Sequence, residues 1–156
     1  MAIPAKVTKH LTLKKIKFEI IPHKTVFTVY DLAQTTKEKL NHIVKTLLVK
    51  TDKDYVLAVV PAHLRLDLAA LKKHLGAKSV SLAKEKDMQT KFNVKPGAMT
   101  PFGSMYKLSV VVDKSLTKAE KMLFGAGTFT ESLRLKMKDY LKTEDPQLAK
   151  ISKKGD

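Results

Sequence analysis

The chain lacks cysteine and long apolar runs, and these absences exclude whole classes of protein. None of its 156 residues is Cys, which excludes disulfide frameworks, thiolate zinc sites, iron–sulfur clusters and cysteine nucleophiles. The longest apolar run, from Tyr55 to Ala62, is far shorter than the ~20 residues that span a bilayer. Residues 1–16 contain neither a continuous apolar core nor a small-residue cleavage site. We therefore expect no secretory signal and a cytoplasmic protein.

Nucleotide and metal motifs are missing as well. The sequence contains no G-x-S-x-G elbow, no phosphate-binding P-loop and no G-x-G-x-x-G fingerprint. Gly125-Ala126-Gly127 superficially resembles a dinucleotide turn, but the residues that follow it have a strand-like pattern. No two of the five histidines are spaced i, i+4, as a helical metal site would need. The sequence therefore predicts no metal and no cofactor.

Positive charge is the strongest compositional signal. There are 30 Lys and Arg against 15 Asp and Glu, and only Arg65 and Arg134 are Arg. Lys attracts phosphates without the planar fork with which Arg reads base edges. The charge therefore favours sequence-independent attraction to a polyanion, either nucleic acid or an anionic membrane. The sequence lacks the long basic amphipathic helix of a membrane binder, and a merely solubilising Lys-rich surface remains an alternative.

The hydrophobic periodicities predict an α+β fold in one domain covering residues 1–156, with a mixed, mostly antiparallel sheet and helices packed around it. Helices or helical turns are expected at 3–11, 30–40, 67–75, 85–92 and 136–141. Strands are expected at 17–21, 42–50, 54–60, 79–82, 108–112, 121–124 and 132–135. Residues 143–156 are expected to form a polar basic tail.

Two segments could carry chemistry. Lys45 lies in an apolar strand on the same side as Leu47 and Val49, where an ammonium loses hydration unless an anion or a carbonyl oxygen contacts it. A Lys that extends to solvent at a strand edge would explain it equally well. Residues 97–103 contain two Gly and one Pro, which suit a rigid loop whose amides approach a ligand. An ordinary tight connection is the alternative for that loop.

The order and spacing of these segments resemble the YbaK/ProX family. The resemblance rests on the Val44–Val49 strand with its Lys, the helix from Leu66-Asp67-Leu68 to Leu75-Gly76-Ala77-Lys78, and the loop Gly97-x-x-x-Pro101-Phe102-Gly103. It extends over nearly the whole chain. The family comprises the editing insertion domain of bacterial prolyl-tRNA synthetases and free-standing aminoacyl-tRNA deacylases.

The resemblance implies roles for individual residues. Lys45 would be the essential cation, and Gly97 and Pro101 would belong to the catalytic loop. Further residues would shape the substrate pocket, namely Thr46, Ala98, Met99, Thr100, Gly125 and Ala126. The chain departs from the family at Gly125, where members often place Ser or His, and at Ala98, where a second Gly is common. The first departure removes a polar side chain from the expected pocket wall.

The resemblance also implies a function, which is hydrolysis of the ester bond of a mischarged aminoacyl-tRNA. Substrates like Cys- or Ala-tRNA(Pro) are expected, with the tRNA acceptor end, and in some cases a synthetase, as partner and no membrane. An aminoacyl ester is already activated, so positioning and electrostatic stabilisation can suffice without a strong nucleophile. A non-catalytic tRNA-binding module of the same fold is the alternative: Lys45 favours the enzyme, and Gly125 mildly favours the module.

Overall fold

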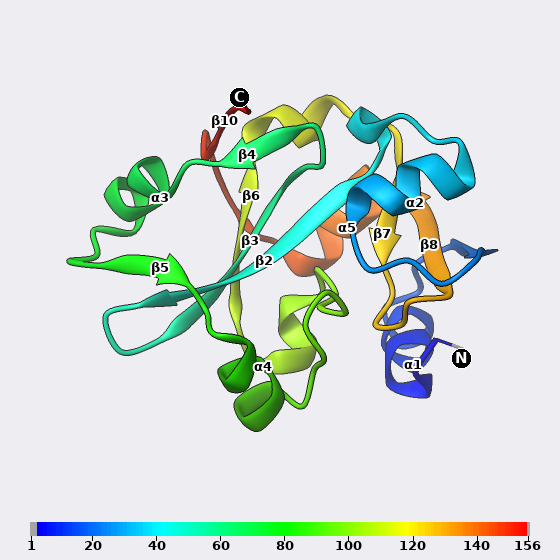
Figure 1. Ribbon diagram of the computed structural model, residues 1–156, viewed down its shortest axis with the longest axis horizontal. Helices are drawn as coiled ribbons and strands as arrows, with labels where there is room; N and C mark the ends of the chain where they lie inside the picture. Colours follow the sequence, from blue (N-terminus) through cyan, green and yellow to red (C-terminus); the bar gives the residue numbers. More distant parts are fainter. Residues whose placement is uncertain (1–2, 156) are drawn as a thin grey trace.

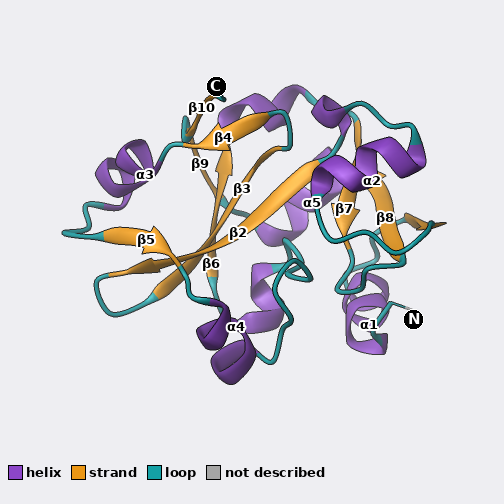
Figure 2. Cartoon of the chain, in the orientation of Figure 1, coloured by secondary structure: helices purple, strands orange, loops and turns teal. Residues whose placement is uncertain are grey.

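The strands form three sheets within residues 3–155, which the computed structural model describes (Figures 1 and 2). The largest sheet is five-stranded and has the order β5-β2-β3-β6-β9; the others are β1-β8-β7 and β10-β4. The strands are β1 (Phe18–Pro22), β2 (Val44–Thr51), β3 (Tyr55–Pro61), β4 (Leu64–Leu66), β5 (Val80–Leu82), β6 (Ser109–Asp113), β7 (Lys121–Gly125), β8 (Glu131–Lys136), β9 (Gln147–Ala149) and β10 (Ser152–Lys154).

Helices surround these sheets, as the sequence predicts. The α-helices are α1 (Ala5–Leu13), α2 (Val29–Thr36), α3 (Leu68–Leu75), α4 (Glu85–Phe92) and α5 (Met137–Glu144). Three short 3-10 helices are η1 (Leu40–His42), η2 (Gly103–Tyr106) and η3 (Lys114–Lys118). The expected α+β fold in a single domain is confirmed. No helix formed by residues 3–155 is both long enough and apolar enough to cross a membrane.

The β2–β3 hairpin organises the large sheet. Its turn closes where the sequence predicts, with the Thr51 amide donating to the Asp54 carbonyl at 2.8 Å. The pairings of β3 with β6 and of β6 with β9 are parallel, while β2 pairs antiparallel with both β3 and β5. A parallel bridge between Ile43 and Leu123 joins the start of β2 to the three-stranded sheet. This junction brings the two sheets together beside Lys45.

The large sheet is apolar on both faces, because a separate hydrophobic cluster covers each one. Along β2 and β3, Val44, Leu48 and residues 57 and 59 belong to the main core, whereas residues 49, 56, 58 and 60 pack under Leu71 of α3. This alternation follows the two-residue period of a strand. It places Lys45 on the α3 side, opposite Val60 of β3.

Local capping signals account for most helix boundaries. Asp67 accepts the Ala70 amide at 3.1 Å and begins α3, and Gly76 ends that helix with a positive φ of 64°. Thr28 similarly accepts the Asp31 amide at 3.1 Å at the start of α2. The helical segment expected at 30–40 is interrupted, because Lys37 adopts a left-handed conformation that ends α2, and η1 follows at Leu40–His42.

The C-terminal segment differs from the expected polar tail. Residues 147–149 form β9 on the edge of the large sheet, and residues 152–154 form β10 against β4. Between them the Ile151 side chain is fully buried in the cluster under α3. The segment is polar on average, but it contains a few apolar side chains. Their burial is enough to pack the segment against the sheet.

Asp113 fixes this C-terminal segment, and its replacement should be strongly destabilising. Its side chain is 1% exposed and accepts the Ile151 amide at 2.9 Å as well as the Ser115 amide and hydroxyl. We expect Asp113→Ala to lower the free energy of unfolding by about 2–4 kcal/mol, because buried donors lose their acceptor. Urea denaturation of the wild type and the variant measures this. A loss below about 0.5 kcal/mol, typical of surface sites, would contradict a structural role for the segment.

Candidate functional site

A cavity of about 290 Å³ lies where the large sheet meets the three-stranded sheet, and we call it the Lys45 cavity. Its walls come from the start of β2, the segment preceding α2, the 97–99 loop and the β7–β8 connection. Of the nine site residues predicted from the sequence, five line it, namely Lys45, Thr46, Gly97, Met99 and Gly125. The structure therefore brings together the strand and the loop on which the resemblance to the editing family rests.

The Lys45 ammonium makes one hydrogen bond within the protein and can make others. Its Nζ donates to the Leu64 carbonyl at 3.0 Å, which leaves two of its three protons for another acceptor. Partial burial lowers the pKa of Lys45, and the nearby positive charge of Arg65 lowers it further. Both effects disfavour the charged form. An anionic or carbonyl oxygen in the cavity would offset the lost hydration.

Two loop residues that line the same cavity have backbone amides without an acceptor within residues 3–155. The amides of Ala98 and Thr100 donate to the Lys95 carbonyl (2.9 Å) and the Tyr106 hydroxyl (3.2 Å). The amides of Gly97 and Met99 have no acceptor within residues 3–155. Gly97 and Met99 are also the two loop residues that line the Lys45 cavity. Amides of this kind can stabilise a developing oxyanion.

Gly97 is required for the path of this loop. Its φ is +84°, and a Cβ there would lie 3.2 Å from the Phe27 carbonyl oxygen and 3.4 Å from the Phe129 ring. A side chain would therefore meet both backbone strain and a close neighbour. Gly125 is similarly tight, since a Cβ would lie 3.2 Å from the Met99 carbonyl oxygen. The glycine at position 125 thus gives room to the loop.

The other four predicted residues lie elsewhere. Ala98 and Thr100 line a second cavity, which we call the Lys6 cavity. Pro101 and Ala126 are buried and line neither cavity. The Pro101 carbonyl accepts the hydroxyl of buried Tyr140 at 2.6 Å, so this residue anchors the loop from behind.

A His–Ser pair in the Lys45 cavity was missed by the sequence reasoning. His23 Nδ1 lies 2.8 Å from the Lys24 carbonyl, so Nδ1 is the protonated nitrogen and Nε2 accepts the Ser132 hydroxyl at 2.9 Å. Both residues line the cavity. Ser132 pairs with Gly125 across β7 and β8, so the polar group absent at Gly125 is supplied by the neighbouring strand. The 109-residue separation of the pair left no local signal.

Two exposed aromatic rings also line this cavity. Phe27 and Tyr30 are 64% and 60% exposed, and both line the cavity near the start of α2. Phe27 packs against Phe129, with ring centroids 4.9 Å apart. Exposed rings of this kind offer flat surfaces on which an unpaired base can stack.

The Thr46 hydroxyl provides a test of whether this residue serves stability or ligand binding. Its Oγ1 is buried and has no hydrogen-bond partner within residues 3–155. Because an unsatisfied buried hydroxyl costs about 1–3 kcal/mol, we expect Thr46→Val to leave the free energy of unfolding unchanged or to raise it by about 1 kcal/mol. Chemical denaturation checks this, with Thr46→Ser as the control that keeps the hydroxyl. A loss of stability in Thr46→Val alone would show that the hydroxyl has a structural partner.

Within residues 3–155, no group of three His, Asp or Glu side chains is placed to hold a metal ion. The polar side chains that line the Lys45 cavity include Lys45 and the His23–Ser132 pair.

Sequence comparison identifies the family. The sequence model of the aminoacyl-tRNA editing domain matches residues 23–143, most of the chain. The chain therefore belongs to the aminoacyl-tRNA editing domain family, and its class is that of the aminoacyl-tRNA deacylases.

Curated relatives agree with this class. The Escherichia coli protein "Multifunctional Ser/Thr-tRNA deacylase ProXp-y" is 29% identical over 84% of this chain and 81% of its own length. The Acetoanaerobium sticklandii "Prolyl-tRNA editing protein ProX" is 30% identical over 65% of this chain and 66% of its own. A proline–tRNA ligase of Macrococcus caseolyticus is 29% identical, but the match covers only 18% of that enzyme.

Solved structures confirm the fold. A hypothetical protein superimposes with a TM-score of 0.88 at 22% identity, covering 95% of this chain and 99% of its own. The structure of a candidate trans-editing enzyme for prolyl-tRNA synthetase superimposes with a TM-score of 0.82 at 22% identity, covering 96% of each chain. At these identities the likeness concerns the fold.

Proposed function

We propose that this protein hydrolyses the ester bond of mischarged aminoacyl-tRNA in trans, with the Lys45 cavity as its active site. The observation that supports the proposal is that Lys45 lines the same small cavity as Gly97 and Met99, the two loop residues whose amides have no acceptor within residues 3–155. A cation and unpaired amides around one point suit an ester carbonyl whose oxygen becomes negative in the transition state.

The reaction needs few protein groups. Water attacks the ester carbon, the bond to the ribose oxygen breaks, and a proton passes to that oxygen, which releases free amino acid and intact tRNA. Lys45 and the loop amides stabilise the charge that develops on the carbonyl oxygen. The exposed rings of Phe27 and Tyr30 are placed to hold the terminal base. Positioning of this kind can replace a strong nucleophile.

The cavity suits small amino acids. Substrates like Cys- or Ala-tRNA(Pro) fit the proposal, since a cavity of about 290 Å³ that must also admit the ester leaves little room for a larger side chain. The His23–Ser132 pair adds a polar wall, and this favours serine as a second candidate. The relative whose name includes Ser/Thr-tRNA deacylase supports the same extension.

A panel of charged tRNAs tests the proposal. We expect purified protein to release amino acid from at least one of Cys-tRNA(Pro), Ala-tRNA(Pro), Ser-tRNA and Thr-tRNA, and to leave Pro-tRNA(Pro) charged. Labelled amino acid released above the spontaneous rate is the measurement. If none of the four is hydrolysed although the RNA binds, the non-catalytic module becomes the better account, and the free loop amides would need another role.

The affinity for tRNA should depend steeply on salt. The net charge of +15 is carried almost entirely by Lys, and contacts between Lys and phosphates release counterions on binding. We expect the dissociation constant to rise roughly tenfold or more between about 50 and about 200 mM salt, which corresponds to a few phosphate contacts. Filter binding or fluorescence anisotropy measures it. An affinity that stays constant over this range would contradict docking through phosphates.

A further inference from the structure

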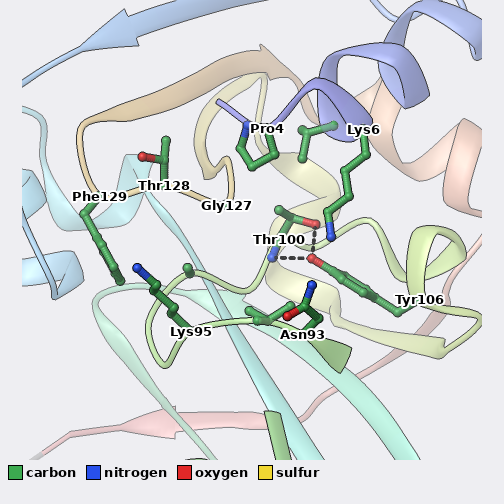
Figure 3. A pocket seen from close by; sticks show the side chains of 12 residues that line it. Pro4, Lys6, Asn93, Lys95, Thr100, Tyr106, Gly127, Thr128 and Phe129 are labelled. Atoms are coloured by element: carbon green, nitrogen blue, oxygen red, sulfur yellow. Dashed lines mark hydrogen bonds between the residues drawn. The ribbon is translucent and has the colours of Figure 1, made fainter. Parts of the chain in front are cut away.

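The Lys6 cavity is a neighbour of the Lys45 cavity, with which it shares Thr128 and Phe129. It encloses about 230 Å³ between the start of α1, the residues after α4 and the β7–β8 connection (Figure 3). Loop residues alternate between the two cavities: Gly97 and Met99 line the Lys45 cavity, whereas Ala98 and Thr100 line the Lys6 cavity. Whatever occupies the second cavity therefore contacts the same loop.

A hydrogen-bond count shows that this cavity has a hydroxyl proton to spare. The Thr100 amide donates to the Tyr106 hydroxyl at 3.2 Å, and the two hydroxyls share one hydrogen bond of 2.9 Å. The Phe102 amide donates to Thr100 Oγ1 at 3.4 Å. Each hydroxyl carries one proton, and only one of the two lies in the shared bond. The other proton has no acceptor within residues 3–155, and the pair joins buried Thr100 to the partly buried Tyr106.

Two lysines line this cavity. In Figure 3 the Lys6 side chain extends toward the Thr100–Tyr106 pair, whereas the Lys95 nitrogen lies on the side of Phe129. Asn93 adds an amide, and no acidic residue is among those that line the cavity. The nearest acid along β8, Glu131, lies outside this lining and accepts the Ile3 amide at 2.8 Å. The charged side chains that line the cavity are therefore both positive.

The N-terminus of α1 adds to the positive electrostatic potential of the cavity. The helix begins at the cavity with Pro4 as its N-cap, no side chain caps it, and its first turn contains no acid. The partial positive charge of a helix N-terminus favours an anion. This partial charge adds to the unshared hydroxyl proton and to the charges of the two Lys side chains, which come from separate elements.

We propose that the Lys6 cavity is a binding site for a phosphate group. Residues with donor groups line it from three parts of the chain, namely α1, the 93–95 segment and the Thr100–Tyr106 pair, and a phosphate has several oxygens that can accept from them. A phosphate bound there would hold Thr100 and thereby steady the loop that forms a wall of the Lys45 cavity. The proposal does not depend on the editing reaction, since it concerns binding alone.

Titration of the isotope-labelled protein with inorganic phosphate, at constant ionic strength and followed by amide NMR, tests the site. We expect saturable shifts at Val7, Ala98 and Thr100. Lys6→Met and Tyr106→Phe should each weaken binding roughly fivefold or more, because each removes one direct donor. The matched control is Lys9→Met, which removes the same charge from the same helix at a residue that does not line the cavity; it should change the affinity by less than about twofold.

Two results would overturn the proposal. One is the absence of saturable shifts at the cavity residues. The other is an equal loss in Lys6→Met and Lys9→Met, which would reduce the effect to overall charge. Tyr106→Phe retains the ring that packs edge-on against Phe92, so misfolding does not confuse its result, and the amide spectrum of each variant confirms its fold.

An arm with RNA distinguishes the two sources of the phosphate group. The probe is an uncharged RNA hairpin that carries the tRNA acceptor end. If a phosphodiester of the RNA is the occupant, Lys6→Met weakens RNA binding more than Lys9→Met does, and bound RNA abolishes the phosphate shifts. If a free phosphate compound is the occupant, the two variants bind RNA equally and phosphate still titrates in the RNA complex. Either result upholds the site and assigns its source.

Discussion

Replacement of Lys45 by Met is expected to reduce the rate of deacylation by roughly 10²–10³-fold, the usual effect of removing one donor to a developing oxyanion. Met keeps an unbranched apolar side chain at a position that lines the Lys45 cavity but removes the ammonium that donates to the Leu64 carbonyl. Single-turnover release of labelled amino acid from the best substrate of the panel measures the effect. Because the ammonium contacts only the Leu64 carbonyl within residues 3–155, the loss should lie in the chemical step more than in tRNA affinity.

Lys50→Met is the matched control for this variant. Lys50 belongs to the same strand, is exposed and does not line the cavity, so the substitution removes the same charge without touching the site. We expect deacylation within about threefold of the wild type under single-turnover conditions with saturating enzyme, because only long-range attraction changes. Comparable losses in Lys50→Met and Lys45→Met would assign the effect to surface charge and remove Lys45 from the proposed mechanism.

The stability of Lys45→Met separates catalysis from folding. Burial and the charge of Arg65 lower the pKa of Lys45 in the folded protein, so the folded state binds this proton less readily than the unfolded state. The charged Lys therefore opposes folding at neutral pH, and this cost is relieved as pH rises through the folded-state pKa. We expect the melting temperature of Lys45→Met at neutral pH to equal or exceed that of the wild type. An inactive variant with a clearly lower melting temperature would leave misfolding as the explanation.

Gly97→Ala should disable the site through the loop. The new Cβ meets the Phe27 carbonyl oxygen at 3.2 Å in a backbone with φ of +84°, so the loop must shift by a few tenths of an ångström. Displacements of up to 1 Å at a reaction centre cost up to about 10²-fold in rate, and we expect a loss of roughly tenfold or more. The free energy of unfolding should fall by about 1–2 kcal/mol from the left-handed backbone alone. Deacylation rates and urea denaturation measure the two effects.

Gly76→Ala separates backbone strain from crowding. Gly76 also has a positive φ, of 64°, but a Cβ there meets nothing within 4 Å, and the residue ends α3 away from the Lys45 cavity. We expect a similar loss of stability, about 1–2 kcal/mol, with deacylation unchanged. Full activity in Gly97→Ala would show that the loop amides need no fixed geometry and would contradict their proposed role.

Local signals in the sequence predicted most of the fold. The caps at Asp67 and Gly76, the hairpin turn at residues 51–54 and the α4 boundaries all rest on interactions between near neighbours. Both partners of such an interaction lie within a few residues of each other, so periodicity and capping rules suffice to predict it. The strand that carries Lys45 was predictable for the same reason.

What the sequence did not reveal depends on distant pairing. Gly125 suggested that a polar group was missing from the pocket, yet Ser132 supplies one through the antiparallel register of β7 and β8. Its partner His23 comes from the end of β1. The parallel pairing of β6 with β9 and the burial of Ile151 likewise need the assembled sheet. The alternation of the loop between two cavities is also a property of the fold and has no sequence pattern of its own.

The most direct test is the structure of the protein bound to a non-hydrolysable 3′-aminoacylamino-adenosine that carries alanine or serine. We predict that its amide carbonyl lies within hydrogen-bonding distance of Lys45 Nζ or the amides of Gly97 and Met99, with the adenine against Phe27 or Tyr30. Binding of the aminoacyl group outside the Lys45 cavity, with Lys45 still bonded only to the Leu64 carbonyl, would contradict the account.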